Sequence, residues 1–376
     1  MRLPRLEGFF SSQSEKNGAV SIRTEPSTIY VEELRGRQGL SFDFTVENRG
    51  DQDLGLRFLK AAVYDSAGDL VSYRYVNRNA VGPSGIDTLG VQGIPAGEIV
   101  DVYNPFPEWP ADLDIARIRY TFTFSGKESR REVYVGDVEV HPQIYEQRTE
   151  LRIPMRGLLT IIDGHDHLSH HRRFAMSLVR RVTNGAFAEN FGRFSLDFAV
   201  IGEDGNLARM EPEEISGNRD FLFTDIRKSF TDGAAVLAPA AGVVVEAIGD
   251  LEDMYDLPFD TDAAFREGRV HDIAGNRVII RHDEREFSHL FHLKKGSLAV
   301  AQGDVVEQGT LLGAIGFSGT ATVYSHLHYQ LMDGADFLTA QALPVQFSDV
   351  TLVRGRERLH LARTAPETGD FLLANA

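Results

Sequence analysis

The chain has 376 residues, 42% of them hydrophobic and 10% aromatic, which is long enough for two globular domains and excludes a disordered protein. It contains no cysteine, so disulfides and thiolate metal ligands are excluded, and only histidines and carboxylates remain to hold a metal. Its net charge of −16 argues against nucleic acid or an anionic membrane as its main partner.

The N-terminal segment and the hydropathy of the chain bear on its location. The first residues include arginines but no apolar stretch of the length that a secretory signal needs. No run of about eighteen apolar residues is present, so no membrane span is expected. We therefore expect a cytoplasmic location by default, or the cell envelope if the chain is exported by another route.

Residues 15–146 have the pattern of short β-strands separated by turns. Leu40, Phe42, Phe44 and Val46 alternate with polar neighbours, and further strand patterns follow this one along the chain. Their spacing predicts an antiparallel β-sandwich, loosely similar to the immunoglobulin-like modules of extracellular and envelope proteins. This half contains no cluster of titratable residues at ligand or catalytic spacing, so we expect it to serve in interaction or positioning.

The polar segment 140–150 marks the boundary to a second predicted domain, residues 150–350. Apolar residues at every fourth position over 174–182 predict a short helix that ends at Gly185. Several histidines come just before it, and they could hold a metal or form a hydrated loop. They are His165, His167, His170 and His171.

Asp197 lies between Leu196 and Phe198 in an apolar strand pattern. A carboxylate at such a position is costly unless it is paired, hydrogen-bonded or bound to a metal. Of these, we favour a metal ligand.

The rest of the second domain is predicted to be an all-β core. Residues 234–319 contain short strands separated by glycine and aspartate turns, apart from an acidic segment over 250–272 that we expect to be looped. Residues 351–376 are expected to form a last strand and a poorly ordered end.

His326 and His328 stand in a strand pattern in which Leu327, Tyr329 and Leu331 are the apolar residues. Because side chains alternate between the faces of a strand, the two histidines project the same way. Two neutral imidazoles on one face could supply one zinc ligand and one acid/base group. A pair at this spacing also arises by chance in a chain with 12 histidines, so a solvated strand face is the plain alternative.

Four segments in fixed order closely resemble the lysostaphin-type zinc endopeptidases, which cut peptides of bacterial cell-wall peptidoglycan. They are 236–247, 275–282, 292–319 and 325–331. The resemblance covers about 150–345 and implies an all-β fold, bound zinc and a peptide substrate. The glycine turns are also similar to lipoyl and biotinyl carrier domains, but a carrier gives no reason for His326, His328 and Asp197.

The resemblance also implies roles for single residues. His328 matches the zinc ligand of the family's HxH motif, and His326 matches its catalytic histidine. His292 matches the family's other catalytic histidine, while Asp197 matches the ligand aspartate of an HxxxD motif. His289, on the same stretch as His292, is expected at the surface or as a neighbour of the site residues, because only His292 belongs to the family's HLKKGS segment.

The sequence departs from the family at Arg193, which stands where the ligand histidine is expected. A guanidinium does not bind zinc. An upstream histidine, His170 or His171, is the natural replacement, and we favour His171. The alternative is a catalytically inactive domain that binds a partner or regulates another cell-wall hydrolase.

Overall fold

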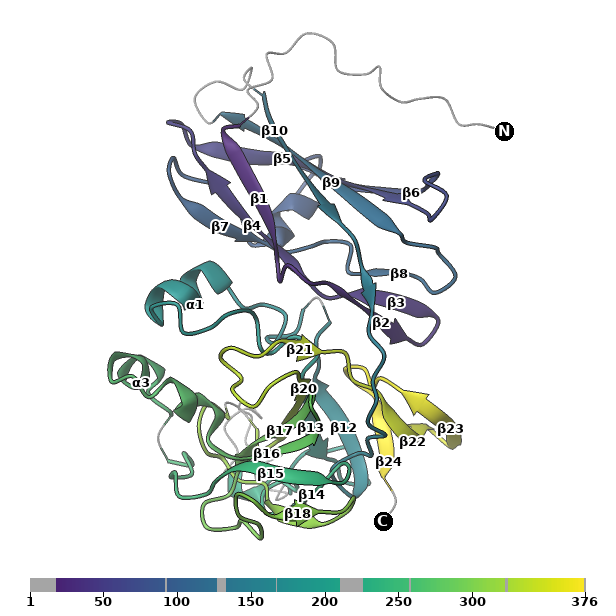
Figure 1. The fold of residues 1–376 in the computed structure, drawn as a ribbon, viewed down its shortest axis with the longest axis vertical. Helices are drawn as coiled ribbons and strands as arrows, with labels where there is room; N and C mark the ends of the chain where they lie inside the picture. Colours follow the sequence, from purple (N-terminus) through teal and green to yellow (C-terminus); the bar gives the residue numbers. More distant parts are fainter. Residues whose placement is uncertain are drawn as a thin grey trace. The chain divides into compact units, whose positions relative to one another are not determined.

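The computed structural model describes residues 18–91, 93–126, 133–166, 168–209, 226–256, 258–321 and 324–374. No helix within these ranges has the length and apolar character needed to cross a membrane. Strands dominate throughout (Figure 1), which confirms the mainly-β fold class.

The chain divides into two compact units. The first comprises Met1–Val31 and Arg37–Gln143, and the second comprises Glu32–Gly36 and Ile144–Ala376.

The described N-terminal part consists of short strands, with a 3₁₀ helix at Gly85–Leu89 in the long connection between Asn77 and Ile99. They are β1 (Val20–Glu25), β2 (Tyr30–Leu34), β3 (Arg37–Leu40), β4 (Asp43–Asn48), β5 (Leu54–Tyr64), β6 (Leu70–Asn77), β7 (Ile99–Val102), β8 (Glu108–Pro110), β9 (Arg117–Gly126), β10 (Val133–Val140) and β11 (Gln143–Ile144). Two antiparallel sheets of the first unit have the orders β1-β4-β7 and β10-β9-β5-β6.

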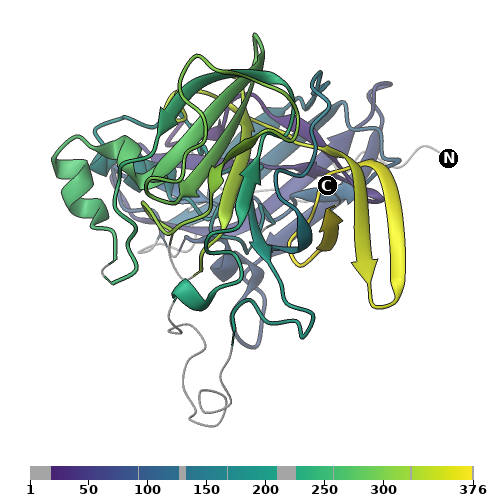
Figure 2. The same ribbon diagram turned by 90° about the horizontal axis from the view of Figure 1, so that it is seen from below.

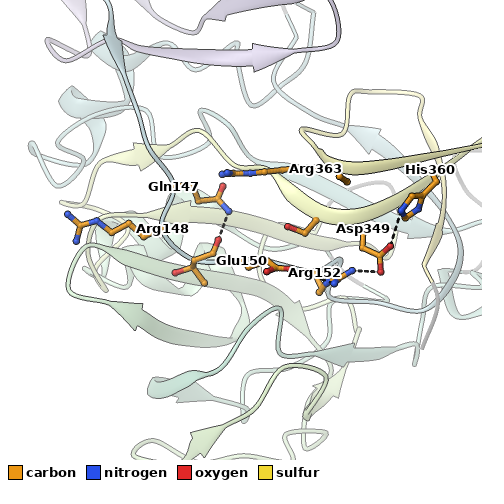
Figure 3. Close-up of a pocket in the computed structure, with 10 residues that line it drawn as sticks. Gln147, Arg148, Glu150, Arg152, Asp349, His360 and Arg363 are labelled. Atoms are coloured by element: carbon orange, nitrogen blue, oxygen red, sulfur yellow. Dashed lines mark hydrogen bonds and ion pairs between the residues drawn. The ribbon is translucent and has the colours of Figure 1, made fainter.

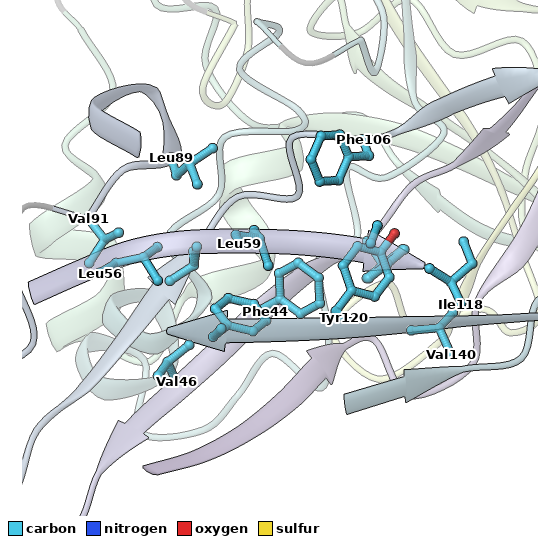
Figure 4. Close-up of a cluster of buried hydrophobic side chains, with 14 of the residues drawn as sticks. Phe44, Val46, Leu56, Leu59, Leu89, Val91, Phe106, Ile118, Tyr120 and Val140 are labelled. Carbon is cyan, nitrogen blue, oxygen red and sulfur yellow. The ribbon is translucent and has the colours of Figure 1, made fainter. Parts of the chain in front are cut away.

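These two sheets of the first unit share one aromatic core (Figure 4). Phe44 of β4 lies 4.9 Å, between ring centroids, from both Tyr120 and Phe122 of β9. Phe44 and its alternate neighbours Phe42 and Val46 are all buried, as the period-two pattern predicted. This packing makes the first unit a β-sandwich.

The second unit contains the remaining strands and two short α-helices in its described part. They are β12 (Gly157–Asp163), α1 (Met176–Val182), β13 (Leu196–Val200), β14 (Ala235–Leu237), β15 (Gly242–Ile248), α3 (Thr261–Arg266), β16 (Asn276–Asp283), β17 (Glu286–Leu293), β18 (Val305–Val306), β19 (Leu311–Ala314), β20 (Leu327–Met332), β21 (Ala342–Leu343), β22 (Phe347–Arg354), β23 (Glu357–Thr364) and β24 (Phe371–Ala374). Single turns of 3₁₀ helix lie at Ile226–Lys228 and Val270–Ala274.

A large antiparallel sheet organises this unit, in the order β18-β15-β16-β17-β20-β13-β12-β24-β22-β23 with β21 beside β20. Its centre joins segments that are far apart in sequence. On β20, His328 is in register with Asp197 of β13 on one side and with Phe291 of β17 on the other. The sheet therefore places the predicted ligand strand between the strands of Asp197 and His292.

The predicted helix is confirmed as α1, Met176–Val182, and Gly185 follows it with a positive φ. Leu178 and Val182 remain 47% and 52% exposed, so much of their apolar surface is not buried. Two other local predictions need correction. The segment 250–272 is not wholly looped, because it contains α3, whose first turn is capped by the Asp260 carboxylate on the Ala263 amide.

The C-terminal prediction was wrong as well. Instead of a last strand with a loose end, β22, β23 and β24 extend the main sheet, with β24 paired to both β12 and β22 (Figure 2). Leu352 and Leu372 are opposite each other and buried, so this extension carries its own apolar contact.

Candidate metal centre and active site

Asp197 lies in the middle of the main sheet with 1% of its surface exposed. Its neighbours Leu196 and Phe198 are fully buried, and strand alternation directs them to the opposite face. A carboxylate enclosed in this way needs compensating partners. The partners are the imidazoles of His171, His326 and His328.

His171, in the loop before α1, is the first of these partners. Its Nδ1 lies 2.7 Å from the carbonyl oxygen of Gly164. Because a carbonyl only accepts, Nδ1 carries the proton and Nε2 presents its lone pair. That Nε2 is buried without a hydrogen-bond partner and lies 3.4 Å from Asp197 Oδ1.

His328 approaches the same carboxylate oxygen from β20. Its Nδ1 is 3.1 Å from Asp197 Oδ1, and its Nε2 is 3.1 Å from the side-chain oxygen of Gln330. The oxygen of Gln330 accepts from Nε2–H, which leaves the lone pair of Nδ1 directed at the carboxylate. Two imidazole lone pairs therefore face one ionised oxygen, an arrangement that a cation would stabilise.

The spacing of these atoms fits zinc. Ligand atoms of His171, Asp197 and His328 all lie within 4.8 Å of one another. Tetrahedral ligands placed about 2.0–2.1 Å from zinc are about 3.3–3.5 Å apart, close to the two distances to Asp197 Oδ1. The donors, two imidazoles and a carboxylate, are those of a site that keeps one position open.

The protonation states of two donors are suited to metal binding. Burial raises the pKa of Asp197, but the neighbouring imidazoles, with His171 and His326 foremost, outweigh it and hold that pKa well below its usual range. Burial lowers the pKa of His171 more than Asp197 raises it. Asp197 is therefore ionised and His171 neutral at neutral pH.

His326 and His292 face the same cavity from another side. His326 Nδ1 lies 2.9 Å from the carbonyl oxygen of Tyr324, and its Nε2 is 3.5 Å from Asp197 Oδ2. His292 Nδ1 lies 2.8 Å from the carbonyl oxygen of Ser318. In both, Nδ1–H donates to a carbonyl and Nε2 keeps its lone pair. The two rings are 4.9 Å apart, so they can act on one bound group.

His292 has features of a functional residue beyond its position. It takes a φ of +65°, a left-handed conformation that non-glycine residues rarely adopt and that concentrates at active sites. Burial, reinforced by His326 and His328, holds the pKa of His292 well below its usual range. His292 is therefore a neutral base at neutral pH.

A cavity of about 460 Å³ brings all five predicted site residues together. Its walls carry the metal-ligating and catalytic candidates on one side and aromatic and aliphatic side chains on the other. The lining residues are Ile162, Asp163, His170, His171, Phe174, Phe191, Asp197, Thr261, Ile273, Ala274, Phe291, His292, Thr320, Tyr324, His326 and His328.

A larger cavity of about 610 Å³ lies elsewhere in the unit, beside β22 and β23 (Figure 3). In it, Arg152 pairs with Asp349, and His360 Nε2 lies 3.4 Å from the same carboxylate. Among the described residues, the groups that could hold a metal are His171 with Asp197 and His328, and His171 with Asp163 and His170; neither group lies there. The smaller cavity is therefore the candidate active site.

The other histidines of the 165–171 cluster have different surroundings. His170 is exposed, and its Nδ1 contacts the carboxylate of Asp163. His165 lies 2.6 Å from the carboxylate of Glu32. His167 is outside the described residues.

Adjacent histidines allow a matched test of the upstream ligand. We expect His171→Ala to weaken zinc binding by more than about 100-fold, beyond what the loss of a residue that only orients a ligand costs. His170→Ala should leave the zinc Kd almost unchanged, because its ring is paired with Asp163 at the surface. Competition with a chelator measures both. A reversed order would assign His170, and no effect of either would point to His165 or His167.

Arg193 does not line the cavity. It is buried, its Nη2 lies 2.8 Å from Glu189 Oε1, and its guanidinium lies 5.3 Å from the ring of Phe194. Arg193 thus has a structural role just before β13. The position beside Asp197 is occupied by His171 instead.

Gln330 and Ser195 are site residues that the sequence analysis missed. Both are fully buried, and the Ser195 hydroxyl lies 2.9 Å from the Gln330 oxygen that holds His328. The available signal was weak: Gln330 shares the strand face of His326 and His328.

Of the two positions expected for His289, the surface is excluded, because His289 is fully buried. Its Nε2–H donates to the carbonyl of Gly334 at 2.9 Å, and burial lowers its pKa to about 4. Below its ordinary pKa of 6.5 the unfolded chain takes up a proton that the folded chain refuses, so stability falls as pH falls through this window.

Replacing His289 by Gln keeps a side-chain donor but removes the titration. Between pH 7 and pH 5 we expect the zinc-free wild type to lose about 2 kcal/mol more unfolding free energy than His289→Gln. Urea unfolding at both pH values measures the difference. Equal losses in the two proteins would show that His289 titrates normally.

Comparison with known proteins identifies part of the chain. Residues 224–339 match the family model described as Peptidase family M23, so this region is a domain of that peptidase family. The match confirms the resemblance indicated by the sequence motifs. It contains His292, His326 and His328, whereas His171 and Asp197 precede it.

Several solved structures are similar to parts of the chain. The catalytic domain of the antimicrobial peptidase lysostaphin from Staphylococcus simulans is 26% identical over 30% of this chain and 68% of that one, with a TM-score of 0.21. A deep-sea M23 metalloprotease, pseudoalterin, is 13% identical over 57% and 96%, with a TM-score of 0.29. The SpoIIQ–SpoIIIAH pore-forming complex is 13% identical over 51% and 87%, with a TM-score of 0.26. No curated protein matches the chain.

Proposed function

We propose that this protein is a zinc-dependent endopeptidase that hydrolyses peptide bonds of cell-wall peptidoglycan. The observation that carries the proposal is the convergence of His171 Nε2, Asp197 Oδ1 and His328 Nδ1 within 4.8 Å, beside the further imidazoles of His292 and His326. The peptidase family of residues 224–339 supports the reaction class.

His171, Asp197 and His328 would hold the metal. When bound, zinc supplies Lewis-acid chemistry that lowers the pKa of a water molecule and polarises the scissile carbonyl. Asp197, ionised and enclosed by imidazoles, adds the negative charge that favours a divalent cation over a proton.

His292 and His326 would move the proton. Their Nδ1–H groups are committed to the carbonyls of Ser318 and Tyr324, so each Nε2 can accept a proton from the attacking water. The imidazolium formed can then donate to the oxyanion or to the leaving amine. The backbone carbonyls fix both rings, which keeps the two Nε2 atoms directed into the cavity.

Metal analysis followed by a cell-wall assay tests the proposal. We expect about one zinc per chain after reconstitution, and a chelator-sensitive loss of turbidity of isolated sacculi. Well under one zinc per chain would refute the metal centre. Bound zinc without cleavage of any peptide substrate would favour the inactive, partner-binding alternative.

We further propose that the sandwich ends near residue 146 and the catalytic part begins near residue 150, and that the catalytic part continues past the expected limit of 350 to β24. All five site residues lie between 163 and 328, so a chain that starts at Glu150 should keep its zinc Kd within about tenfold. Circular dichroism would verify that the shortened chain is folded. A folded fragment that binds no zinc would refute these limits.

A further inference from the structure

Gln330 occupies the buried side of the candidate metal centre and is fully inaccessible to solvent. It follows His328 by two positions on β20, so both side chains lie on one face of the strand. Its oxygen is 3.1 Å from His328 Nε2 and 2.9 Å from the hydroxyl of Ser195. Its nitrogen is 2.8 Å from the sulfur of Met332.

These partners allow only one orientation of the Gln330 amide. The sulfur of Met332 can accept but cannot donate a hydrogen bond, so the amide nitrogen is the group that suits it. The amide oxygen then faces Ser195 and His328, both of which can donate. A flipped amide would place its oxygen against the sulfur, leaving two acceptors in contact.

The fixed amide determines which nitrogen of His328 carries the proton. An acceptor beside Nε2 favours the tautomer protonated at Nε2, with the lone pair on Nδ1. Asp197 alone would favour the opposite tautomer, because its Oδ1 lies 3.1 Å from Nδ1 and would accept a proton there. The two neighbours of the ring therefore compete, and only the tautomer favoured by Gln330 can bind a metal through Nδ1.

His328 differs from the other imidazoles of the cavity in the group that accepts its N–H hydrogen bond. The Nδ1–H groups of His171, His292 and His326 donate to backbone carbonyls, which a substitution does not remove. His328 depends on a side chain. Its tautomer is thus the one that a single replacement can change.

We propose that Gln330, oriented by Ser195 and Met332, is a positioning residue that holds His328 in its metal-binding tautomer and thereby sets the zinc affinity. This proposal rests on the proposed zinc centre. Side chains that orient a metal-bound histidine typically contribute 10- to 100-fold to affinity. Gln330 differs from a carboxylate in that role because it adds no second buried anion beside Asp197.

The decisive comparison uses the full chain with Gln330→Met, which keeps the length of the side chain but has no carbonyl. We expect its zinc Kd, from chelator competition, to be about 10- to 100-fold weaker than that of the wild type. Gln330→Glu retains an acceptor beside Nε2 and should recover most of the affinity. Tyr329→Phe is the matched control, because it removes one buried hydrogen bond, to Ser288, from the same strand and should leave the Kd unchanged.

Imidazole ¹⁵N shifts of the zinc-free protein provide a readout that needs no metal. The wild type should show His328 protonated at Nε2, and Gln330→Met should move the proton toward Nδ1. A wild-type proton on Nδ1, or a Kd and tautomer unaffected by Gln330→Met, would overturn the proposal. If the wild type shows the Nε2–H tautomer but binds no zinc, the metal centre fails while the tautomer assignment stands. Should Gln330→Met not fold, the wild-type ¹⁵N shifts still report the tautomer of His328, and the zinc Kd of Gln330→Glu still tests the need for an acceptor beside Nε2.

Discussion

Replacing His328 or Asp197 by alanine is expected to abolish zinc binding and peptidase activity together. Each contributes one of the three converging donor atoms, and Asp197 Oδ1 lies 3.1 Å from His328 Nδ1 and 3.4 Å from His171 Nε2. Without either residue, two donors remain. We expect the zinc Kd to weaken by more than about 100-fold, the upper limit for residues that merely orient a ligand.

Asp197→Ala should have the larger effect of the two. Its carboxylate supplies the only negative charge among the three donors, and its low pKa means that no proton competes for it at neutral pH. Asp349→Ala and His360→Ala, in the other cavity of the unit, are matched controls and should leave metal content and activity unchanged. Full zinc occupancy in His328→Ala would show that zinc binds elsewhere and would refute this metal centre.

Local sequence patterns predicted the strands of the site but not its complete ligand set. Period-two alternation places His326 and His328 on one face of β20, and an acid between apolar residues marks Asp197. Both inferences need only the sequence within one strand, because side chains alternate between its two faces. The register that sets Asp197 opposite His328 joins residues 131 positions apart, and it could be expected only from resemblance to known peptidases.

The choice between His170 and His171 shows where local patterns end. The two residues are adjacent histidines, so the sequence does not distinguish them. Their contacts do: His171 donates to the carbonyl of Gly164, whereas the exposed His170 contacts Asp163. Likewise, the spacing over 174–182 predicts the helix α1 but not how far its apolar side chains are buried, and Leu178 remains 47% exposed. Both outcomes depend on tertiary contacts, which periodicity does not encode.

The second large effect concerns the histidines that touch the reacting atoms without holding the metal. We expect His326→Ala to retain zinc while turnover falls about 10²- to 10⁴-fold, the usual contribution of a positioned acid or base. The reason is geometric: His326 Nε2 lies 3.5 Å from Asp197 Oδ2, on the other oxygen from the one that His171 and His328 share. Zinc content and kcat on a peptide substrate, measured on the same preparation, separate this role from that of a ligand.

His292→Ala should behave in the same way, and the double variant should be little slower than either single one. The two rings are 4.9 Å apart and face one cavity, so they serve one proton-transfer step, and groups that act as a unit show strongly non-additive losses. Full additivity would mean that His292 and His326 act in separate steps. Loss of zinc from His326→Ala would identify His326 as a ligand. His292 would then be the group that accepts the proton of the attacking water, since its depressed pKa keeps its Nε2 unprotonated.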